Sequence, residues 1–131
     1  MMKVIRFAGV ALALALAACG LGMTIGIYSV DKPIPAAVQS ADVYQIEAYI
    51  NQALTTKGWK ADKVRPGELR ATQEWDNKVA VVTILYSQQR YSIKLHSSLN
   101  LDEGNGRIDN QYNIRIRQLE SEIDRRMKPT G

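Results

Sequence analysis

Apolar residues recur along the chain with two different periods, which predicts a mixture of helices and strands. One stripe at helical spacing lies between residues 41 and 57 and consists of Val43, Ile46, Ile50 and Leu54. A second stripe predicts a helix from 108 or 109 to 127 and consists of Tyr112, Ile116, Leu119, Ile123 and Met127. Ser40 is the predicted N-cap of the first helix, and Gly58 is its predicted C-cap.

Between the two helices the period is two, which is typical of strands. Residues 68–75 and 90–97 alternate between apolar and polar side chains. Residues 78–87 are apolar on both faces and rich in valine, isoleucine and threonine, which predicts the central strand of a sheet. Tight turns at Asp76-Asn77 and Gln88-Gln89 join these strands, so they form an antiparallel meander.

The element order α-β-β-β-α predicts an α+β fold. We expect a two-layer sandwich, with a three-stranded antiparallel meander flanked by two helices on one face. The central strand is apolar on both sides, so the other face carries an apolar strip. Two interpretations of this strip are open. Trp59, the preceding linker or long flanking side chains cover it, or it forms a surface for a partner.

The first 18 residues have the layout of a secretory signal peptide. Lys3 and Arg6 precede an uncharged run from Phe7 to Ala18 that is rich in alanine and leucine. The run ends in Leu16-Ala17-Ala18-Cys19, which resembles the lipobox of bacterial lipoproteins. The motif predicts cleavage before Cys19 and acylation of its thiol, with palmitate among the acyl chains, which would anchor the mature chain in a membrane.

Gly20 follows the cysteine, where enteric bacterial lipoproteins that stay in the inner membrane carry aspartate. By analogy, we expect the protein in the cell outer membrane, facing the periplasm. An alternative is open, because no charge appears from Phe7 to Val30, and this stretch is long enough for an uncleaved membrane span. Both interpretations place the rest of the chain outside the cytoplasm.

Pro33 and Pro35 lie among small and polar residues in the segment 31–41, which predicts an extended linker. The expected organisation is a signal peptide at 1–18, a lipidated N-terminus and tether at 19–40, and a periplasmic domain at 41–128. Such a tether reaches at most about 70 Å from Cys19 to Ser40.

Composition narrows the function classes. The chain of 131 residues has one cysteine and one histidine, so it forms no internal disulfide and holds no paired-histidine metal site. Its formal charge is +4, and removal of Lys3 and Arg6 with the signal peptide leaves 15 Lys+Arg against 13 Asp+Glu, or +2. This small excess gives no support to nucleic-acid binding.

The candidate chemistry is sparse. His96 alternates with Ser92 and Lys94 on the expected solvent side of a strand, and no Gly-x-Ser-x-Gly motif supports a hydrolase built on Ser92 or Ser98. The acidic loop 102–106 lacks the regular ligand spacing of a calcium loop. We therefore expect no enzyme activity, no catalytic residues, no metal and no cofactor. The residues predicted for an interaction surface are Trp59, Arg70, Trp75, Lys94 and His96.

Several short motifs together resemble a group of small proteobacterial envelope lipoproteins. They include the lipobox and the segments Val30-Asp31-Lys32-Pro33-Ile34-Pro35, Gly58-Trp59, Pro66-Gly67, Tyr91-Ser92-Ile93, Ser98-Leu99-Asn100-Leu101 and Tyr112-Asn113. The resemblance covers residues 28–127 and implies an envelope location and a shared fold. It implies no activity, because none is established for that group.

The expected function is that of a non-enzymatic interaction or assembly module, held at the membrane by its lipid anchor. The expected partner is another envelope protein or an envelope polymer. A periplasmic domain that binds a lipid or a glycan is the alternative.

The lipobox makes a direct prediction. The substitution Cys19→Ala should abolish incorporation of labelled palmitate and leave the protein as a larger precursor, because the thiol that receives the lipid is gone. Metabolic labelling and the mass of the mature protein measure both effects. Absence of palmitate from the wild-type protein would refute the prediction.

Overall fold

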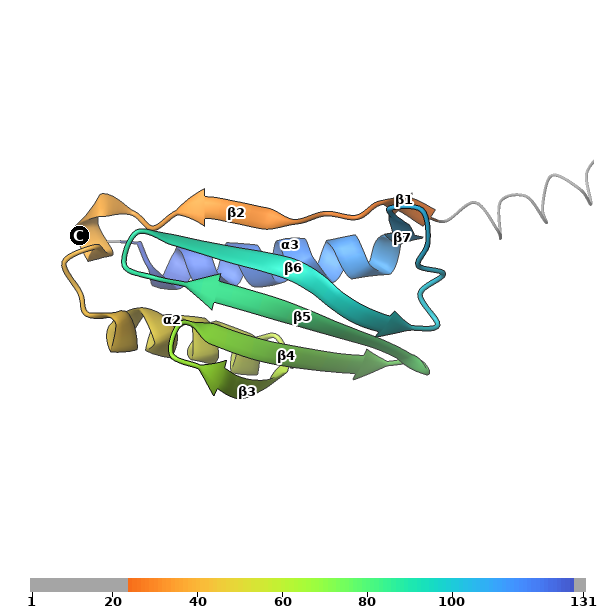
Figure 1. The fold of residues 1–131 in the computed structure, drawn as a ribbon, viewed down its shortest axis with the longest axis horizontal. Helices are drawn as coiled ribbons and strands as arrows, with labels where there is room; N and C mark the ends of the chain where they lie inside the picture. Colours follow the sequence, from red (N-terminus) through yellow and green to blue (C-terminus); the bar gives the residue numbers. More distant parts are fainter. Residues whose placement is uncertain (1–23, 129–131) are drawn as a thin grey trace, which may run out of the picture.

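The computed structural model describes residues 24–128, which form two sheets and two α-helices (Figure 1). The larger sheet has five strands in the order β2-β6-β5-β4-β3, with all neighbours antiparallel. Its strands are β2 (Val30–Pro33), β3 (Lys60–Arg65), β4 (Glu68–Trp75), β5 (Lys78–Tyr86) and β6 (Arg90–Leu99). The smaller sheet pairs β1 (Thr24–Gly26) with β7 (Arg107–Asp109). The helices are η1 (Ala36–Val38), α2 (Val43–Thr56) and α3 (Asn110–Arg126).

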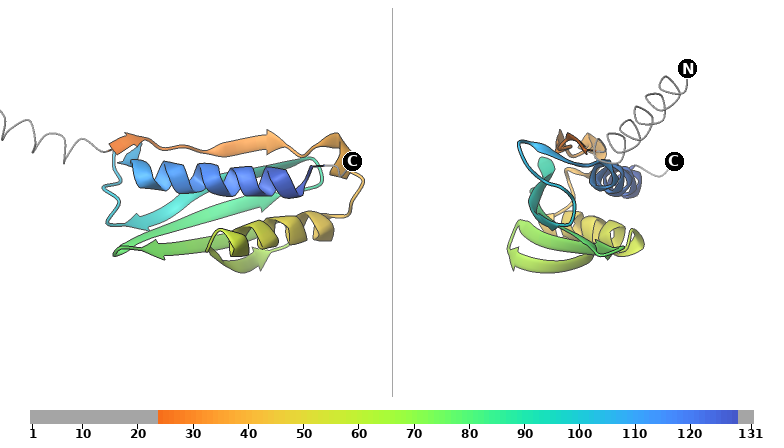
Figure 2. Two further views of the ribbon diagram at one scale, coloured as in Figure 1. Left: turned by 180° about the vertical axis from the view of Figure 1, so that it is seen from behind. Right: turned by 90° about the vertical axis from the view of Figure 1, so that its right-hand side faces the viewer.

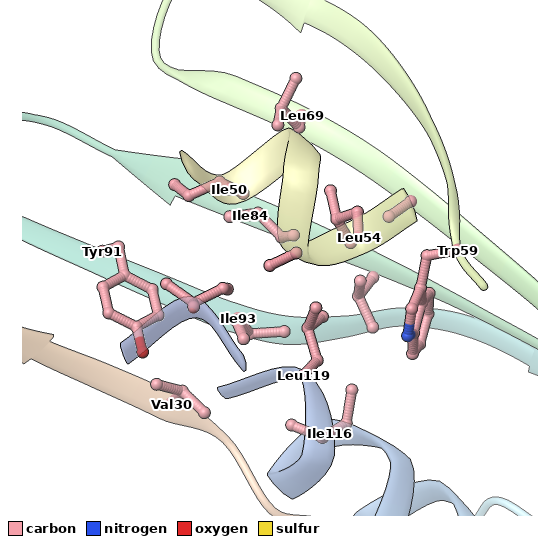
Figure 3. Packing of buried hydrophobic residues seen from close by; sticks show 14 of the residues in the cluster. Val30, Ile50, Leu54, Trp59, Leu69, Ile84, Tyr91, Ile93, Ile116 and Leu119 are labelled. Carbon is pink, nitrogen blue, oxygen red and sulfur yellow. The ribbon is translucent and has the colours of Figure 1, made fainter. Parts of the chain in front are cut away.

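Both α-helices lie on the same face of the five-stranded sheet. Figure 2 shows α2 and α3 side by side in front of the sheet when the molecule is seen from behind. The core fills the space between the two layers, as Figure 3 shows around Ile84, Ile93 and Leu119. All three side chains are fully buried. In Figure 1 no helix or strand lies over the opposite face of β4, β5 and β6.

This mostly-β architecture overturns the predicted α+β sandwich with a three-stranded meander. The three predicted strands are present as β4, β5 and β6, and β5 is central as expected. Both predicted helices are present, and the stripe from Tyr112 to Met127 is fully buried. The prediction missed the other four strands. In β3 only Ala61 is half-buried, so the strand shows no alternation, and β1 and β7 have three residues each.

The segment predicted to be an extended linker belongs to the fold. It contains β2 and η1, and Val30 and Ile34 are 3% and 1% exposed. Pro33 ends β2, which is an edge strand, so the missing amide hydrogen costs no ladder bond on the outer side. The linker interpretation was wrong because an edge strand with proline and charged residues has the composition of a tether.

The first residues of the fold are held to α3 and β6 by a polar cluster, which we call the N-terminal clamp. It consists of Tyr28, Lys32, Tyr91, Asn113, Glu120 and Asp124. The buried Asn113 side chain accepts from the Tyr28 amide at 3.0 Å and donates to the Gly26 carbonyl at 2.8 Å. Lys32 Nζ donates to Glu120 and Asp124 at 2.7 and 2.6 Å.

Two tyrosine hydroxyls complete the clamp. Tyr28 donates to Glu120 at 2.6 Å, and Tyr91 donates to Asp124 at 2.7 Å. The hydrogen bond to Glu120 and then burial raise the pKa of Tyr28, while burial and then Asp124 raise the pKa of Tyr91. Burial alone would lower the pKa of Lys32, but the hydrogen bonds and charges of Asp124 and Glu120 raise it. All three groups keep their protons at neutral pH, and the stabilisation that their raised pKa values represent is lost as pH rises into the alkaline range.

Asp42 caps the start of α2, and Trp59 packs into the core just after its end. The N-cap is Asp42, whose carboxylate accepts from the Gln45 amide at 2.9 Å, so the predicted cap at Ser40 is corrected by two residues. Gly58 follows the helix with φ of +81°, a conformation that favours glycine. The Trp59 amide then donates to the Leu54 carbonyl at 2.8 Å, which turns the Trp59 ring into the core.

The clamp makes a stability prediction. Asn113→Ala should lower the free energy of unfolding by about 1–3 kcal/mol, because it removes a buried side chain and leaves the partly buried Tyr28 amide and Gly26 carbonyl without that partner. It should also accelerate amide hydrogen exchange within residues 24–34. Gln118→Ala, on the exposed side of the same helix, is the matched control and should change stability by less than about 0.5 kcal/mol. Equal effects of the two substitutions would contradict the role of Asn113.

Candidate functional site

The face of the larger sheet that points away from the helices is the candidate site, and we call it the open sheet face. Successive side chains of a strand point to opposite faces, so β4, β5 and β6 each contribute alternate residues to it. Its members are Glu68, Arg70, Thr72, Glu74, Val79, Val81, Thr83, Leu85, Ser92, Lys94, Ser97 and Leu99.

An apolar ridge runs along the middle of this face. It consists of Val79, Val81 and Leu85 on β5, together with Leu99, which pairs with Val79 across to β6. Leu85 is 48% exposed and Leu99 is 58% exposed, so much of the ridge is in contact with water. On the helix side of the same strand, β5, Val82 and Ile84 are fully buried. The face therefore carries apolar area that the fold itself leaves uncovered.

A β-bulge in β6 completes the ridge. Val82 pairs with Leu95, but Val81 pairs with Ser97, so β6 has one extra residue, His96, at this point. An unbroken alternation from Ile93 would point Leu99 to the helix side, and the extra residue turns it to the open sheet face. His96 itself is exposed at the bulge.

Two cations flank the ridge in a single cross-strand row. Arg70 and Lys94 both pair with Thr83, one from each side, so their backbones lie about two strand spacings, or ~9.6 Å, apart. Within residues 24–128, Lys94 has no carboxylate within 4 Å.

Arg70 is also incompletely satisfied. Its Nη2 lies 3.5 Å from a Glu68 oxygen, and Glu68 also pairs with Arg65 at 3.2 Å. The Arg70 Nε is buried without a hydrogen-bond partner in the described part of the chain. The row therefore places two cations on either side of Thr83, with Val81 and Leu85 before and after it on the same face of β5, an arrangement that suits a carboxylate with apolar neighbours.

Of the residues that the sequence predicted for an interaction surface, some lie on the open sheet face or at its bulge and others lie elsewhere. Arg70 and Lys94 come together in one row, as described, and His96 is exposed at the bulge. Trp59 is corrected from surface to core, because it is only 5% exposed after the turn at Gly58.

Trp75 lies on the helix side of β4, outside the open sheet face. Its ring packs 3.9 Å from the Arg115 guanidinium, and its Nε1 donates to Gln111 at 2.7 Å. Other arginines of α3 are similarly engaged. Arg117 stacks on Tyr28 at 3.9 Å, and Arg126 pairs with Glu122 at 2.8 Å. The basic residues of this helix therefore serve internal contacts.

The residues considered for catalysis do not form a site within 24–128. Ser98 donates to Glu103 at 2.6 Å, and no hydrogen bond joins His96 to Ser92 or Ser98. The same residues contain no group of three or more His, Cys, Asp or Glu side chains placed to hold a metal ion. The lipidation site Cys19 and the lipobox residues Leu16, Ala17 and Ala18 lie outside the described residues.

Comparison of the chain with protein-family models, curated proteins and solved structures returned no significant match. Neither helix of the described region is long and apolar enough to cross a membrane. The candidate site therefore rests on its own geometry.

The sequence predicted an apolar strip on one face of the central strand and left open whether it is covered or forms a partner surface. It left open which set of side chains forms that strip, and the structure shows that Val79, Val81 and Leu85 do. Sequence reasoning missed Leu99, since its direction depends on the bulge.

The two faces of β5 make a matched prediction. Leu85→Thr should change the free energy of unfolding by less than about 1 kcal/mol, because the side chain is half in water and threonine suits a strand. Ile84→Thr, one residue away, should cost about 2–4 kcal/mol, since it leaves a void and buries a hydroxyl. Denaturant unfolding of both variants measures the difference. A large loss for Leu85→Thr would mean that the ridge is part of the core.

Proposed function

We propose that the protein is a lipid-anchored, non-enzymatic interaction module of the bacterial cell envelope, and that it binds a partner protein through the open sheet face. The observation that carries the proposal is the apolar ridge, with Leu85 and Leu99 48% and 58% exposed on a face that no helix or strand of residues 24–128 covers. Exposed apolar side chains gathered on one face are typical of interaction surfaces.

The charges around the ridge indicate which side chains a partner surface would carry. Arg70 and Lys94 bracket Thr83, so a complementary surface carries an acidic side chain at its centre, with apolar side chains on either side of it. We therefore propose a protein surface that is apolar around a central carboxylate.

A second copy of the chain fits this face poorly. If two copies pack face to face about a two-fold axis along the strands, Arg70 of each copy lies opposite Lys94 of the other. If the axis crosses the strands at the centre of the ridge, Glu68 and Glu74 of β4 lie opposite each other instead. Either arrangement opposes like charges, which disfavours a symmetric dimer.

The membrane location is supported by the lipobox and by where the fold begins. Residues 24–30 of the uncharged stretch belong to the folded domain or its first connections. This leaves residues 7–23, 17 residues, for an uncleaved span, which is the lower limit for a helix that crosses a bilayer. A cleaved and acylated Cys19 is the better proposal, and Gly20 favours the outer membrane.

Site-specific crosslinking in cells tests the proposed surface. A photoreactive amino acid at Ser97, exposed on β6 opposite Val81, should capture one envelope protein. The double reversal Arg70→Glu and Lys94→Glu should lower that yield at least tenfold, because it replaces attraction for a carboxylate by repulsion. The same amino acid at Gln118, exposed on α3, is the position control and should not capture that protein.

Each other result counts against the proposal. A product of two copies of this chain would identify a homodimer surface, and a polymer adduct would identify a glycan-binding face. Capture that is insensitive to the charge reversal would refute the proposal that the partner presents a central carboxylate. Recovery of uncrosslinked monomer alone would refute the proposal that the open sheet face binds a partner. The unfolding midpoint of the double variant shows whether loss of capture reflects loss of the fold.

A further inference from the structure

The N-terminal clamp determines how far the folded domain lies from Cys19. Three pairs join β1 to β7, and the Ile27 amide donates to the Gly106 carbonyl at 3.0 Å. Asn113 holds the connection between β1 and β2, and Lys32 ties β2 to α3. No stretch of residues 24–34 is therefore free to serve as a tether.

The clamp shortens the reach of the anchor. With residues up to Ser40 extended, the domain would lie as much as about 70 Å from Cys19. Because β1 begins at Thr24, four residues separate the acylated cysteine from β1. The five Cα–Cα steps from Cys19 to Thr24 span at most about 18 Å even in a fully extended chain.

One end of the domain is consequently close to the lipid. Figure 1 shows β1 and β7 at one end of the long axis, together with the loop after β6. Arg107 donates to the Thr24 carbonyl at 2.7 Å, and Asn100 donates to the Asn77 carbonyl at 2.7 Å, so the hairpin between β4 and β5 lies at this end too. The hairpin at 87–89 lies at the other end of β6, whose ten residues span ~33 Å.

We propose that the end formed by β1, β7, the loop 100–106 and the hairpin 76–77 is the membrane-facing surface of the domain. Its partner is the lipid surface that holds the acyl chains of Cys19, so the inference rests on the lipidation included in the proposed function. The row of Val79 and Leu99 then lies nearest to the lipid, and Leu85 lies farther out.

Charge does not hold this end at the bilayer. Asp76, Asp102 and Glu103 are exposed there, against the exposed Arg107 and the half-buried Lys78. Anionic phospholipids repel such an acidic end. The short chain between Cys19 and Thr24 is therefore what sets the distance.

Energy transfer from the domain to the lipid tests the orientation. Acylation consumes the one native cysteine, so an engineered cysteine is the only free thiol. The full-length acylated protein carries a donor dye at Glu103→Cys or at Gln89→Cys, both exposed. Vesicles of phosphatidylethanolamine and phosphatidylglycerol carry an acceptor dye on a headgroup. Transfer should be several-fold stronger from position 103 than from position 89. Equal transfer, or stronger transfer from position 89, would overturn the proposal.

A lengthened anchor supplies the second test. Insertion of about 20 glycine and serine residues between Gly22 and Met23 adds a flexible chain without touching the fold. Transfer from position 103 should fall several-fold, towards the value for position 89. Asn113→Ala should shift transfer in the same direction by releasing the clamp. Unchanged transfer after the insertion would show that the chain length does not position the domain.

The two proposals fail in different ways. The mass of the N-terminal peptide shows whether Cys19 is acylated, and an unmodified cysteine would refute the lipid anchor of the proposed function. With Cys19→Ser added so that the engineered cysteine is again the only thiol, the comparison of positions 89 and 103 would still decide the orientation, because an uncleaved span would also end next to Thr24. Acylation with equal transfer from both positions would refute the orientation alone.

Discussion

The connection between β1 and β2 is held to α3 by two hydrogen bonds of one buried side chain, Asn113. The carbonyl of Gly26 and the amide of Tyr28 both meet Asn113, and a carboxamide supplies one donor and one acceptor in a fixed geometry. Ordering the backbone of the N-terminal segment costs about 1–2 kcal/mol per residue. Burial of Val30 and Ile34, with the ion pairs of Lys32, offsets that cost. Without this set of contacts the same residues would be the tether that their composition suggests.

Helices cover only one face of the five-stranded sheet, and the side chains on the other face are of types that can be partly exposed to water. The uncovered residues of β5 are mostly valine and threonine, whose branched side chains suit a central strand even when partly in water. Arg70 and Lys94 lie on either side of Thr83, where their aliphatic stems shield part of the ridge. The domain therefore folds with its apolar ridge exposed, and the same ridge is free to be buried again against another protein.

Local signals account for the part of the fold that the sequence predicted. Long periodic segments identified α2, α3 and the three middle strands. The positions of the two turns, at Asp76-Asn77 and between β5 and β6, also determine which residues pair, because each hairpin pairs outward from its turn. This pairing aligns Arg70, Thr83 and Lys94. The juxtaposition at the candidate site was thus implied by the turns, although the two cations were identified only as separate surface residues.

The missed features depend on contacts between distant parts of the chain. β3 and β2 have the charge and proline content of edges, and they are strands because β4 and β6 supply their partners. The bulge at His96 leaves no mark in the sequence, yet it turns Leu99 to the open sheet face.

The clamp and the open sheet face together restrict where a partner is found. If Cys19 is acylated as proposed, the domain lies within about 18 Å of its anchor and meets only what lies at or near the same membrane surface. Confinement to that surface would raise the effective concentration of any partner anchored beside it, so that a modest apolar ridge with two cations could support association there. The same ridge would bind weakly to a partner free in solution, since its area is small and water reaches Leu85 and Leu99. Under this proposal, the short anchor contributes to specificity as directly as the side chains of the open sheet face do, because it determines which acidic surfaces those side chains meet.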